Sequence, residues 1–279
     1  MIFVTGGNGQ LGKSLKKVES EIQTFSSSEC DITSYESVHK ALENSKEGDF
    51  LINCAAYTAV DLAEEDQDNA FLVNRDSLAI LSKICQEKDL NLIHISTDYV
   101  FDGNNHRPYK ESDSVSPQSV YGASKKEGEE SLIQSSFKNY SIVRTSWVYS
   151  EYGKNFVKTM MALSKKEELS VVFDQVGSPT YATDLAEFLI RMTNEFEKCR
   201  GEIFHFSNEG VLSWYDFAVE IMEELKSKCT IHPIESHQFP TKAKRPHYSV
   251  LNKSKIKKTL NYNVPYWKEG LRKCLKNLS

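Results

Sequence analysis

A glycine-rich stretch at the N-terminus constrains the fold more than any other feature of this 279-residue sequence. Residues 2–4 form a short apolar run typical of a β-strand, glycines follow at positions 6, 9 and 12, and residues 11–18 have the apolar spacing of a helix. In such a strand–turn–helix, glycines permit the tight turn, let the backbone approach a pyrophosphate and let the helix pack closely on the strand. The stretch therefore predicts a dinucleotide-binding loop, with a purely structural glycine turn as the alternative.

Composition limits the class of protein. Hydrophobic residues make up 39% and charged residues 26%, as in soluble globular proteins. The net charge of −5 argues against general binding to nucleic acids or anionic membranes. No apolar run approaches the length of a membrane span, and because a strand is predicted at the N-terminus we expect no signal peptide. The six cysteines lack C-x-x-C pairs and the seven histidines do not cluster, so we expect a reducing, cytoplasmic setting and no metal site.

Strands alternate with helices over the first 144 residues. Apolar runs indicate further strands at residues 22–25, 50–53, 92–95 and 140–143, and helical patterns cover residues 35–44, 59–66, 70–88 and 122–135. The alternation predicts an α/β fold with a Rossmann-type, doubly wound parallel sheet covered on both faces. Ligands of such sheets bind beyond the carboxyl ends of the strands, where polar residues are therefore candidates for a site.

The pattern becomes less regular toward the C-terminus. Helices are expected over residues 155–165, 183–196, 214–226 and 266–278, and strands over residues 169–173 and 203–206. Ser213 and Asp216 have the spacing of a capping box. We therefore expect a dinucleotide-binding domain over residues 1–150 and mainly a substrate-binding lobe over residues 151–279. Residues around 181–210 are expected to return to the first domain.

Tyr121 and Lys125 lie four residues apart on one predicted helix, and so on the same face of it. A lysine ammonium stabilises phenolate, so this tyrosine could exchange a proton nearer neutral pH than its reference pKa of about 10. The alternative is a solvated helix start that carries a chance tyrosine–lysine pair.

Residues 96–103 follow the fourth predicted strand, at the edge where ligands are expected. A hydroxyl here, such as that of Thr97, can hydrogen-bond a substrate carbonyl together with Tyr121. An ordinary strand-end turn is the alternative. Three features occur in this order in one chain: the glycine loop, a hydroxyl after the fourth strand and the tyrosine–lysine pair. This ordered set favours an active site.

This ordered set resembles the extended short-chain dehydrogenase/reductase superfamily, and within it the chain resembles the dTDP-4-dehydrorhamnose reductases. The resemblance runs nearly end to end, over residues 5–12, 53–61, 96–103, 120–125, 143–149, 155–160, 174–180 and 245–246. The tyrosine–lysine pair is general to the superfamily. The segments 96–103, 144–149 and 174–180 are far more specific to the reductases.

The resemblance implies a role for each candidate residue. Tyr121 would be the proton donor, Lys125 would bind the nicotinamide ribose and lower the tyrosine pKa, and Thr97 would hold the reacting oxygen. The implied cofactor-binding residues are Gly6, Gly9, Gln10, Leu11, Gly12, Asp31, Ile32, Ala55, Ala56, Tyr57, Tyr121 and Lys125. The implied substrate-binding residues are Thr97, Asp98, Trp147, Asn155 and Arg245.

Several of these residues also have a structural alternative. Trp147 could belong to the core, Asn155 could cap a helix, and Arg245 before a proline could lie in a surface turn. A fixed guanidinium does suit a diphosphate, because it binds in a bidentate manner and stays charged. Asn74 could hold the backbone near the cofactor or cap a helix.

The resemblance implies reduction of the C4 ketone of dTDP-4-dehydro-6-deoxy-L-mannose (dTDP-4-dehydro-L-rhamnose) to dTDP-L-rhamnose, for surface polysaccharide. The predicted strand at residues 22–25 ends in serines rather than the carboxylate that repels a 2′-phosphate, so we expect NADPH with some use of NADH. The expected partners are a dTDP-sugar and a second copy of the chain in a homodimer, with no nucleic acid or membrane. Two alternatives stay open, namely a reductase of another dTDP-4-keto-6-deoxy sugar and a regulatory subunit like that of methionine adenosyltransferase.

Overall fold

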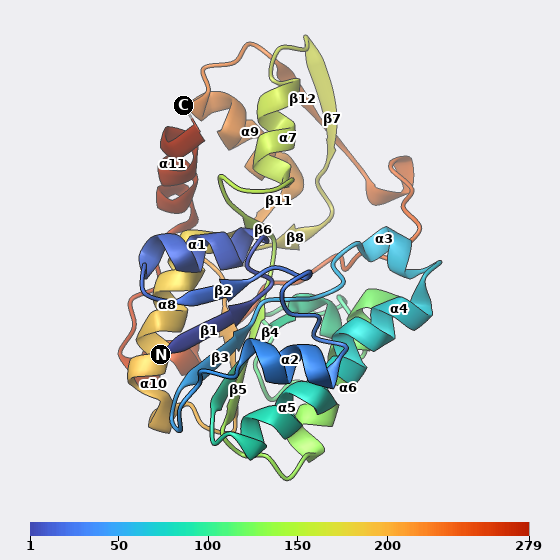
Figure 1. Cartoon of the computed structure of the whole chain (residues 1–279). Helices are drawn as coiled ribbons and strands as arrows, with labels where there is room; N and C mark the ends of the chain where they lie inside the picture. Colours follow the sequence, from blue (N-terminus) through green and yellow to red (C-terminus); the bar gives the residue numbers. More distant parts are fainter. Residues whose placement is uncertain (279) are drawn as a thin grey trace.

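A six-stranded parallel sheet forms the centre of the lower part of the molecule in a computed structural model that describes residues 1–278 (Figure 1). Its strands lie in the order β10-β5-β4-β3-β1-β2. From β1 the chain adds β2 on one side and then β3, β4 and β5 on the other, so the winding changes direction between β1 and β3. The strand bounds are β1 Ile2–Thr5, β2 Gln23–Phe25, β3 Phe50–Asn53, β4 Asn91–Thr97, β5 Tyr140–Thr145 and β10 Glu202–Phe206.

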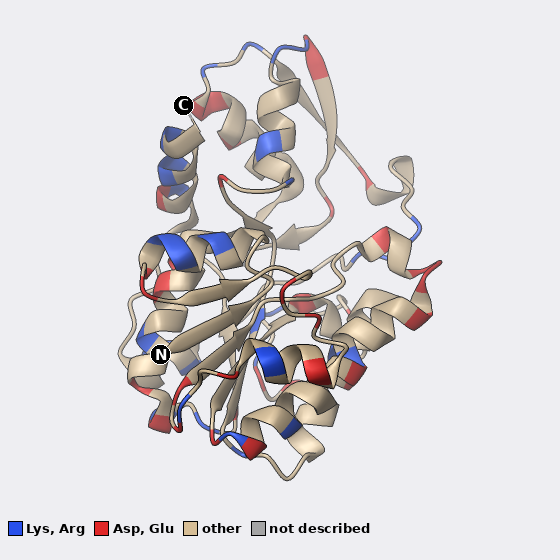
Figure 2. Cartoon of the chain, viewed as in Figure 1, with Lys and Arg blue, Asp and Glu red and all other residues tan. Residues whose placement is uncertain are grey.

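Helices cover both faces of this sheet, which confirms the predicted doubly wound architecture. One layer holds α1 (Gln10–Val18), α8 (Ala182–Asn194) and α10 (Ser254–Leu260), and the other holds α2 (Tyr35–Ala41), α5 (Ser77–Glu87) and α6 (Val120–Gln134). Successive strand residues face opposite layers: Phe3 packs in one core cluster and Val4 in the other. Both faces are covered by helices, so the strand residues are mostly buried and mainly apolar, and the charges lie mainly on helices and loops (Figure 2).

A smaller lobe sits above the carboxyl ends of the strands (Figure 1). Its core lies between α7 (Phe156–Leu163), α9 (Trp214–Glu224), α11 (Trp267–Leu278) and β7 (Glu168–Val172), which pairs in parallel with β12 (Thr230–Ile234). Two short strand pairs complete the sheet structure, β6 (Val148–Tyr149) with β9 (Thr180–Tyr181) and β8 (Val176–Gly177) with β11 (Leu212–Ser213). The predicted capping box of Ser213 and Asp216 is present at the start of α9.

The chain crosses between the two parts more than once. After residue 150 it builds α7 and β7 of the upper lobe and then returns to the sheet as α8 and β10. After α9 it returns again as α10, whose Ile256 and Leu260 join the core cluster beneath the sheet. The residues that cover one face of the sheet therefore come from the second half of the sequence.

The predicted helix over residues 70–88 is wrong in its middle. The chain forms α4 (Gln67–Phe71), then a π-helical turn at Leu72–Asp76, and only then α5. Asn74 lies in this turn, and its side chain bonds the backbone N–H and C=O of Tyr57 and the hydroxyl of Ser124. These contacts between segments outweigh the local helical preference, and π-turns of this kind are frequent at functional sites.

No helix within residues 1–278 is long and apolar enough to cross a membrane. The six cysteines are all free thiols, and five of them are buried.

Candidate active site

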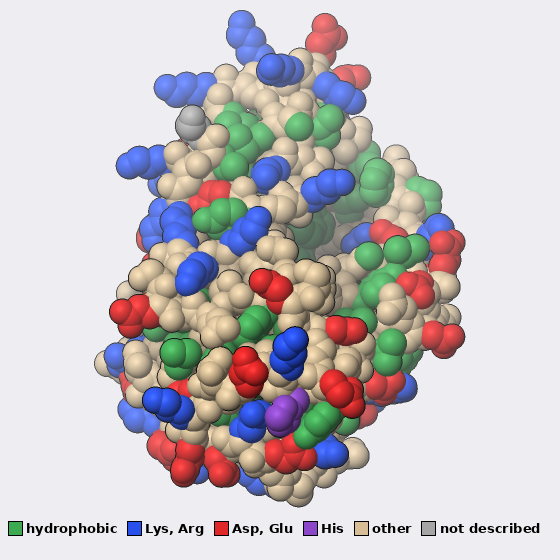
Figure 3. Space-filling model, in the orientation of Figure 1, with side chains coloured by type: hydrophobic (Ala, Val, Ile, Leu, Met, Phe, Trp, Pro, Cys, Tyr) green, Lys and Arg blue, Asp and Glu red, His purple; other side chains and the backbone are tan. Residues whose placement is uncertain are grey.

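A cavity of about 780 Å³ lies at the carboxyl ends of the strands, beside the point where the winding of the sheet reverses. The surface is visibly hollowed between the upper lobe and the short helix α3 (Val60–Ala63) (Figure 3). Every predicted site residue lines the cavity except Tyr57, Asn155 and Arg245. The predicted residues make up nearly half of those that line the cavity, and its position matches the rule for ligands of parallel sheets.

The glycine loop forms one end of the cavity. Gly6 has a φ of +68°, and a Cβ there would lie 2.7 Å from the backbone nitrogen of Ala55. A Cβ on Gly12 would lie 2.5 Å from the carbonyl oxygen of Gly6. Gly9 is the N-cap of α1, with no side chain bonded to the first N–H groups, so this helix end is open to an anion. The loop therefore fits the pyrophosphate of a dinucleotide.

The end of β2 carries a carboxylate that the sequence analysis did not predict. The N–H and the hydroxyl of Ser26 donate to Glu29 at 2.8 and 2.6 Å, so a negative charge lies directly after the strand. Asp31 lines the cavity, and its carboxylate accepts from the N–H and hydroxyl of Thr33. The sequence signal for Glu29 is an acidic residue three positions after Ser26, the first residue beyond the strand.

Tyr121 and Lys125 lie on α6, one turn apart, as predicted. Burial raises the pKa of Tyr121 well above its ordinary value, and a hydrogen bond with Thr97 opposes this shift. The ammonium of Lys125 points instead to the carbonyl of Ile95 (2.8 Å) and the ring of His94 (3.1 Å). Burial outweighs any lowering of the Tyr121 pKa by Lys125 in this structure, and the role of Lys125 toward Tyr121 stays a prediction. Burial also lowers the pKa of Lys125 to about 8.

Thr97 and Asp98 stand at the carboxyl end of β4, facing the cavity. The Thr97 hydroxyl donates to Asp98 Oδ1 at 3.1 Å, while Oδ2 is buried without a partner. Burial raises the pKa of Asp98 to about 6. An unpartnered carboxylate oxygen beside the tyrosine offers a site for a donor, such as a sugar hydroxyl.

Trp147 forms part of the cavity wall and is half-buried. Its ring stacks on that of Trp214 with centroids 3.6 Å apart, and Gly177 leaves room for it, since a Cβ there would lie 2.7 Å from the indole. Trp147 has a φ of +48°, a strained conformation that points to function rather than packing alone. Trp214 follows the N-cap of α9, and nothing in the local sequence pattern predicted this pairing.

The three residues outside the cavity wall have other partners. Asn155 is the N-cap of α7, and its amide also donates to Gln10 Oε1 at 2.9 Å. Arg245 donates to Asp61 at 2.7 Å and to the hydroxyl of Tyr99 at 3.1 Å. The Tyr57 hydroxyl bonds Asp66, while its backbone is held by Asn74. Asn155 and Arg245 therefore touch residues of the cavity wall.

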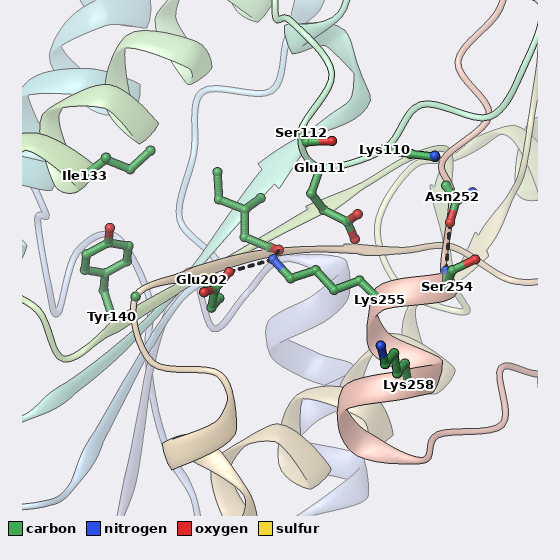
Figure 4. A pocket seen from close by; sticks show the side chains of 12 residues that line it. Lys110, Glu111, Ser112, Ile133, Tyr140, Glu202, Asn252, Ser254, Lys255 and Lys258 are labelled. Atoms are coloured by element: carbon green, nitrogen blue, oxygen red, sulfur yellow. Dashed lines mark hydrogen bonds and ion pairs between the residues drawn. The ribbon is translucent and has the colours of Figure 1, made fainter.

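A second cavity, of about 700 Å³, lies near the amino ends of β5 and β10 (Figure 4). Lys110, Lys255 and Lys258 line it together with Glu111 and Glu202, and Lys255 pairs with Glu202 at 2.7 Å. Ligands of parallel sheets bind at the opposite ends of the strands, so this cavity is not the candidate active site. No metal-binding cluster of histidine, cysteine and carboxylate side chains occurs within residues 1–278.

Comparisons with known proteins agree over the whole chain. The family model of the RmlD substrate binding domain matches residues 1–279. A dTDP-4-dehydrorhamnose reductase of Aggregatibacter actinomycetemcomitans is 39% identical, over 97% of both chains. The spore coat polysaccharide biosynthesis protein SpsK of Bacillus subtilis is also 39% identical, over 100% of this chain and 98% of its own.

Solved structures give the same result. A dTDP-4-dehydrorhamnose reductase of Clostridium acetobutylicum superposes with a TM-score of 0.92, at 39% identity and 99% coverage of both chains. The Bacillus anthracis enzyme, solved in complex with NADP, also gives a TM-score of 0.92, at 36% identity over 99% of this chain and 98% of its own. The chain therefore belongs to the RmlD family, together with the dTDP-4-dehydrorhamnose reductases that it resembles.

Proposed function

We propose that the protein reduces the C4 ketone of dTDP-4-dehydro-L-rhamnose to dTDP-L-rhamnose with NADPH. The observation that carries the proposal is the meeting of Thr97, Tyr121 and Lys125 with the glycine loop around one cavity. Membership of the RmlD family supports this substrate class. The Bacillus anthracis relative in complex with NADP supports the cofactor.

The glycine loop and the N-terminus of α1 would hold the pyrophosphate of NADPH, with Gln10 and Leu11 nearest to it. Asp31 and Ile32 would border the adenine, and Ala55, Ala56 and Lys125 would face the ribose and nicotinamide. When bound, NADPH supplies the hydride that reduces the ketone carbon.

Tyr121 supplies the proton. Its raised pKa keeps the phenol protonated at neutral pH, the form that can donate to the developing alkoxide. The Thr97 hydroxyl holds the same oxygen by a hydrogen bond as negative charge develops on it. These two side chains therefore provide the acid and the oxyanion stabilisation from within the chain.

Asp98 and Trp147 would contact the sugar nucleotide in the same cavity. The guanidinium of Arg245 has the geometry to bind a diphosphate in a bidentate manner. It is engaged with Asp61 and Tyr99, so diphosphate binding would replace those contacts. The homodimeric state and the cytoplasmic location stay predictions from the sequence.

The experiment follows NADPH oxidation with dTDP-4-dehydro-L-rhamnose generated in situ, and identifies the product by NMR. Turnover to dTDP-L-rhamnose is expected, and Tyr121→Phe should lower kcat by about 100-fold or more while cofactor binding persists. Turnover to a different epimer would reassign the sugar. Absence of turnover by a protein that binds NADPH would overturn the proposal.

A further inference from the structure

A segment of the chain, residues 239–247 (the strap), runs from the upper lobe after β12 toward α10 and passes beside α3 (Figure 1). The N–H of Ala243 donates to Asp61 Oδ1 at 3.1 Å, and Arg245 Nη2 donates to Asp61 Oδ2 at 2.7 Å. Asp61 lies on α3, next to a residue that lines the active-site cavity. One carboxylate therefore fastens the strap at the rim of the cavity.

The two oxygens of Asp61 have different functions. Oδ1 accepts from a backbone N–H, which a neutral amide oxygen could also do. Oδ2 faces the guanidinium of Arg245, whose charge only a carboxylate can balance. Replacement of Asp61 by asparagine would therefore separate the anchoring of the strap from the balancing of the charge.

The guanidinium of Arg245 lies between α3 and the cavity wall. Its Nη1 donates to the hydroxyl of Tyr99 at 3.1 Å, while Nη2 is engaged with Asp61. Tyr99 lines the cavity, and its ring meets that of Tyr121 edge to face, with centroids 5.6 Å apart. The guanidinium thus contacts the wall beside the proposed proton donor while Asp61 occupies its second terminal nitrogen.

The pair of Asp61 and Arg245 is suited to exchange. The two side chains are 42% and 28% exposed, so water screens their attraction, and such pairs contribute little to stability. Asp61 offers Arg245 one oxygen, since the other accepts from Ala243. A diphosphate carries more negative charge and can accept two parallel N–H bonds from one guanidinium.

We propose that Asp61 is a positioning residue that holds Arg245 while the cavity is free and competes with the substrate diphosphate for it. The inference rests on the proposed function, in which Arg245 binds that diphosphate. Binding then includes the release of the Asp61–Arg245 pair, which lowers the affinity for the sugar nucleotide. The pair forms again as the product leaves, so the same carboxylate favours release of a product that still carries the diphosphate.

A second ion pair fastens the same strap without Arg245. Lys242 pairs with Glu65, two residues beyond α3, and these side chains are 60% and 57% exposed. Removal of this pair also takes one negative charge from the rim and loosens the strap. It leaves Arg245 with Asp61, and so provides a matched control for both of these effects.

Isothermal titration calorimetry on the full chain tests the proposal with dTDP and with thymidine, which lacks the phosphates. NADPH is kept at saturation, so that dTDP does not occupy the glycine loop. Asp61→Asn should bind dTDP about two- to fivefold more tightly, the range that an exposed ion pair supports, and thymidine equally well. Glu65→Gln should change neither affinity. A purely structural role for Asp61 predicts weaker binding of both ligands, and that result would overturn the proposal.

Arg245→Gln decides whether the effect passes through the guanidinium. This variant should weaken dTDP binding by about tenfold or more, and adding Asp61→Asn to it should then bring no gain. A gain that persists without Arg245 would reduce the role of Asp61 to simple repulsion of the ligand, and an unchanged dTDP affinity in Arg245→Gln would also contradict the proposal. These titrations involve no turnover, so the proposed reaction stands or falls separately, in the assay of NADPH oxidation.

Discussion

At the scale of single residues, burial has a clear energetic cost for the carboxylate of Asp98. It is 2% exposed, one of its oxygens has no partner, and its pKa is raised to about 6 from an ordinary 3.8. The folded protein thus holds this proton more tightly than the unfolded chain, and stability is lost as the pH rises from about 4 to about 6. Two pKa units correspond to about 3 kcal/mol.

Asp98→Asn should therefore be more stable than the wild type above pH 6, by up to about 3 kcal/mol, with the difference shrinking toward pH 4. Activity should fall, because the variant replaces a proposed sugar contact. Urea unfolding at pH 4.5 and pH 7.5 measures the change, with the exposed Asp68→Asn as control. An equal stability difference at both pH values would show that ionisation of Asp98 is not its cause.

Glu29 bears on the choice between NADPH and NADH. Its carboxylate occupies the N–H and hydroxyl of Ser26, the donors that a 2′-phosphate at the end of β2 would need. Glu29→Gln removes the charge and should strengthen binding of 2′,5′-ADP severalfold while leaving ADP binding nearly unchanged.

Isothermal titration calorimetry with these two nucleotides measures the preference for a 2′-phosphate. Neither nucleotide contains a nicotinamide ring, so contacts of that ring do not contribute. Glu36→Gln, an exposed acid in the first turn of α2, controls for the general loss of negative charge. A parallel gain for both nucleotides in Glu29→Gln would mean that the 2′-phosphate does not approach Ser26.

The residues that the sequence predicted share one property, which is a position fixed by local spacing. Tyr121 and Lys125 are one helical turn apart, and Thr97 is the last residue of β4. His94 and Trp214 were not predicted as site residues, because their roles arise from contacts with segments far away in the sequence. Strand periodicity marks His94 only as a buried position.

At the scale of elements, the close approach of α6 to the π-helical turn positions Tyr121 and Lys125. A Cβ on Gly128 would lie 2.1 Å from the carbonyl oxygen of Asn74. Gly128→Ala would force these segments apart, and it should destabilise the fold by about 1–3 kcal/mol despite the higher helix propensity of alanine.

Thermal and urea unfolding measure this cost. Glu130→Ala, which breaks only the partly exposed pair with Lys126 on the same helix, should change stability by less than about 0.5 kcal/mol. Gly128→Ala should also weaken NADPH binding, because Asn74 holds the backbone of Tyr57 next to Ala55 and Ala56. A neutral or stabilising result would show that α6 can shift freely.

The element boundaries illustrate where periodicity fails. The capping box of α9 was predicted because Ser213 and Asp216 satisfy it locally. The π-helical turn was not, because the bonds of Asn74 to Tyr57 and Ser124 that hold it cross between elements. Short strands such as β6 and β9 were also missed, since two residues carry no periodicity.

At the scale of the whole molecule, the sheet is completed by the second half of the chain. Strand β10 pairs with β5 along its whole length, and α8 and α10 cover one face of the sheet. The sequence pattern predicted the sheet and the return of residues around 181–210 to the first domain. It did not predict α10, since a seven-residue helix after a proline-rich stretch has little pattern of its own.

This arrangement predicts the behaviour of a fragment that stops at residue 150, the boundary suggested by the sequence. Without the later segments, Val4, Ile52, Ile93 and Val143 would lose the cover that α8 and α10 provide. Fragment 1–150 should therefore lack cooperative unfolding, show a poorly dispersed NMR spectrum and bind a hydrophobic dye, as compact states with exposed apolar surface do. Co-expression with residues 151–279 should restore a folded complex that binds NADPH. A well-dispersed spectrum and a cooperative transition for residues 1–150 alone would show instead that the dinucleotide-binding half folds independently, and that the returning segments only add to a finished core.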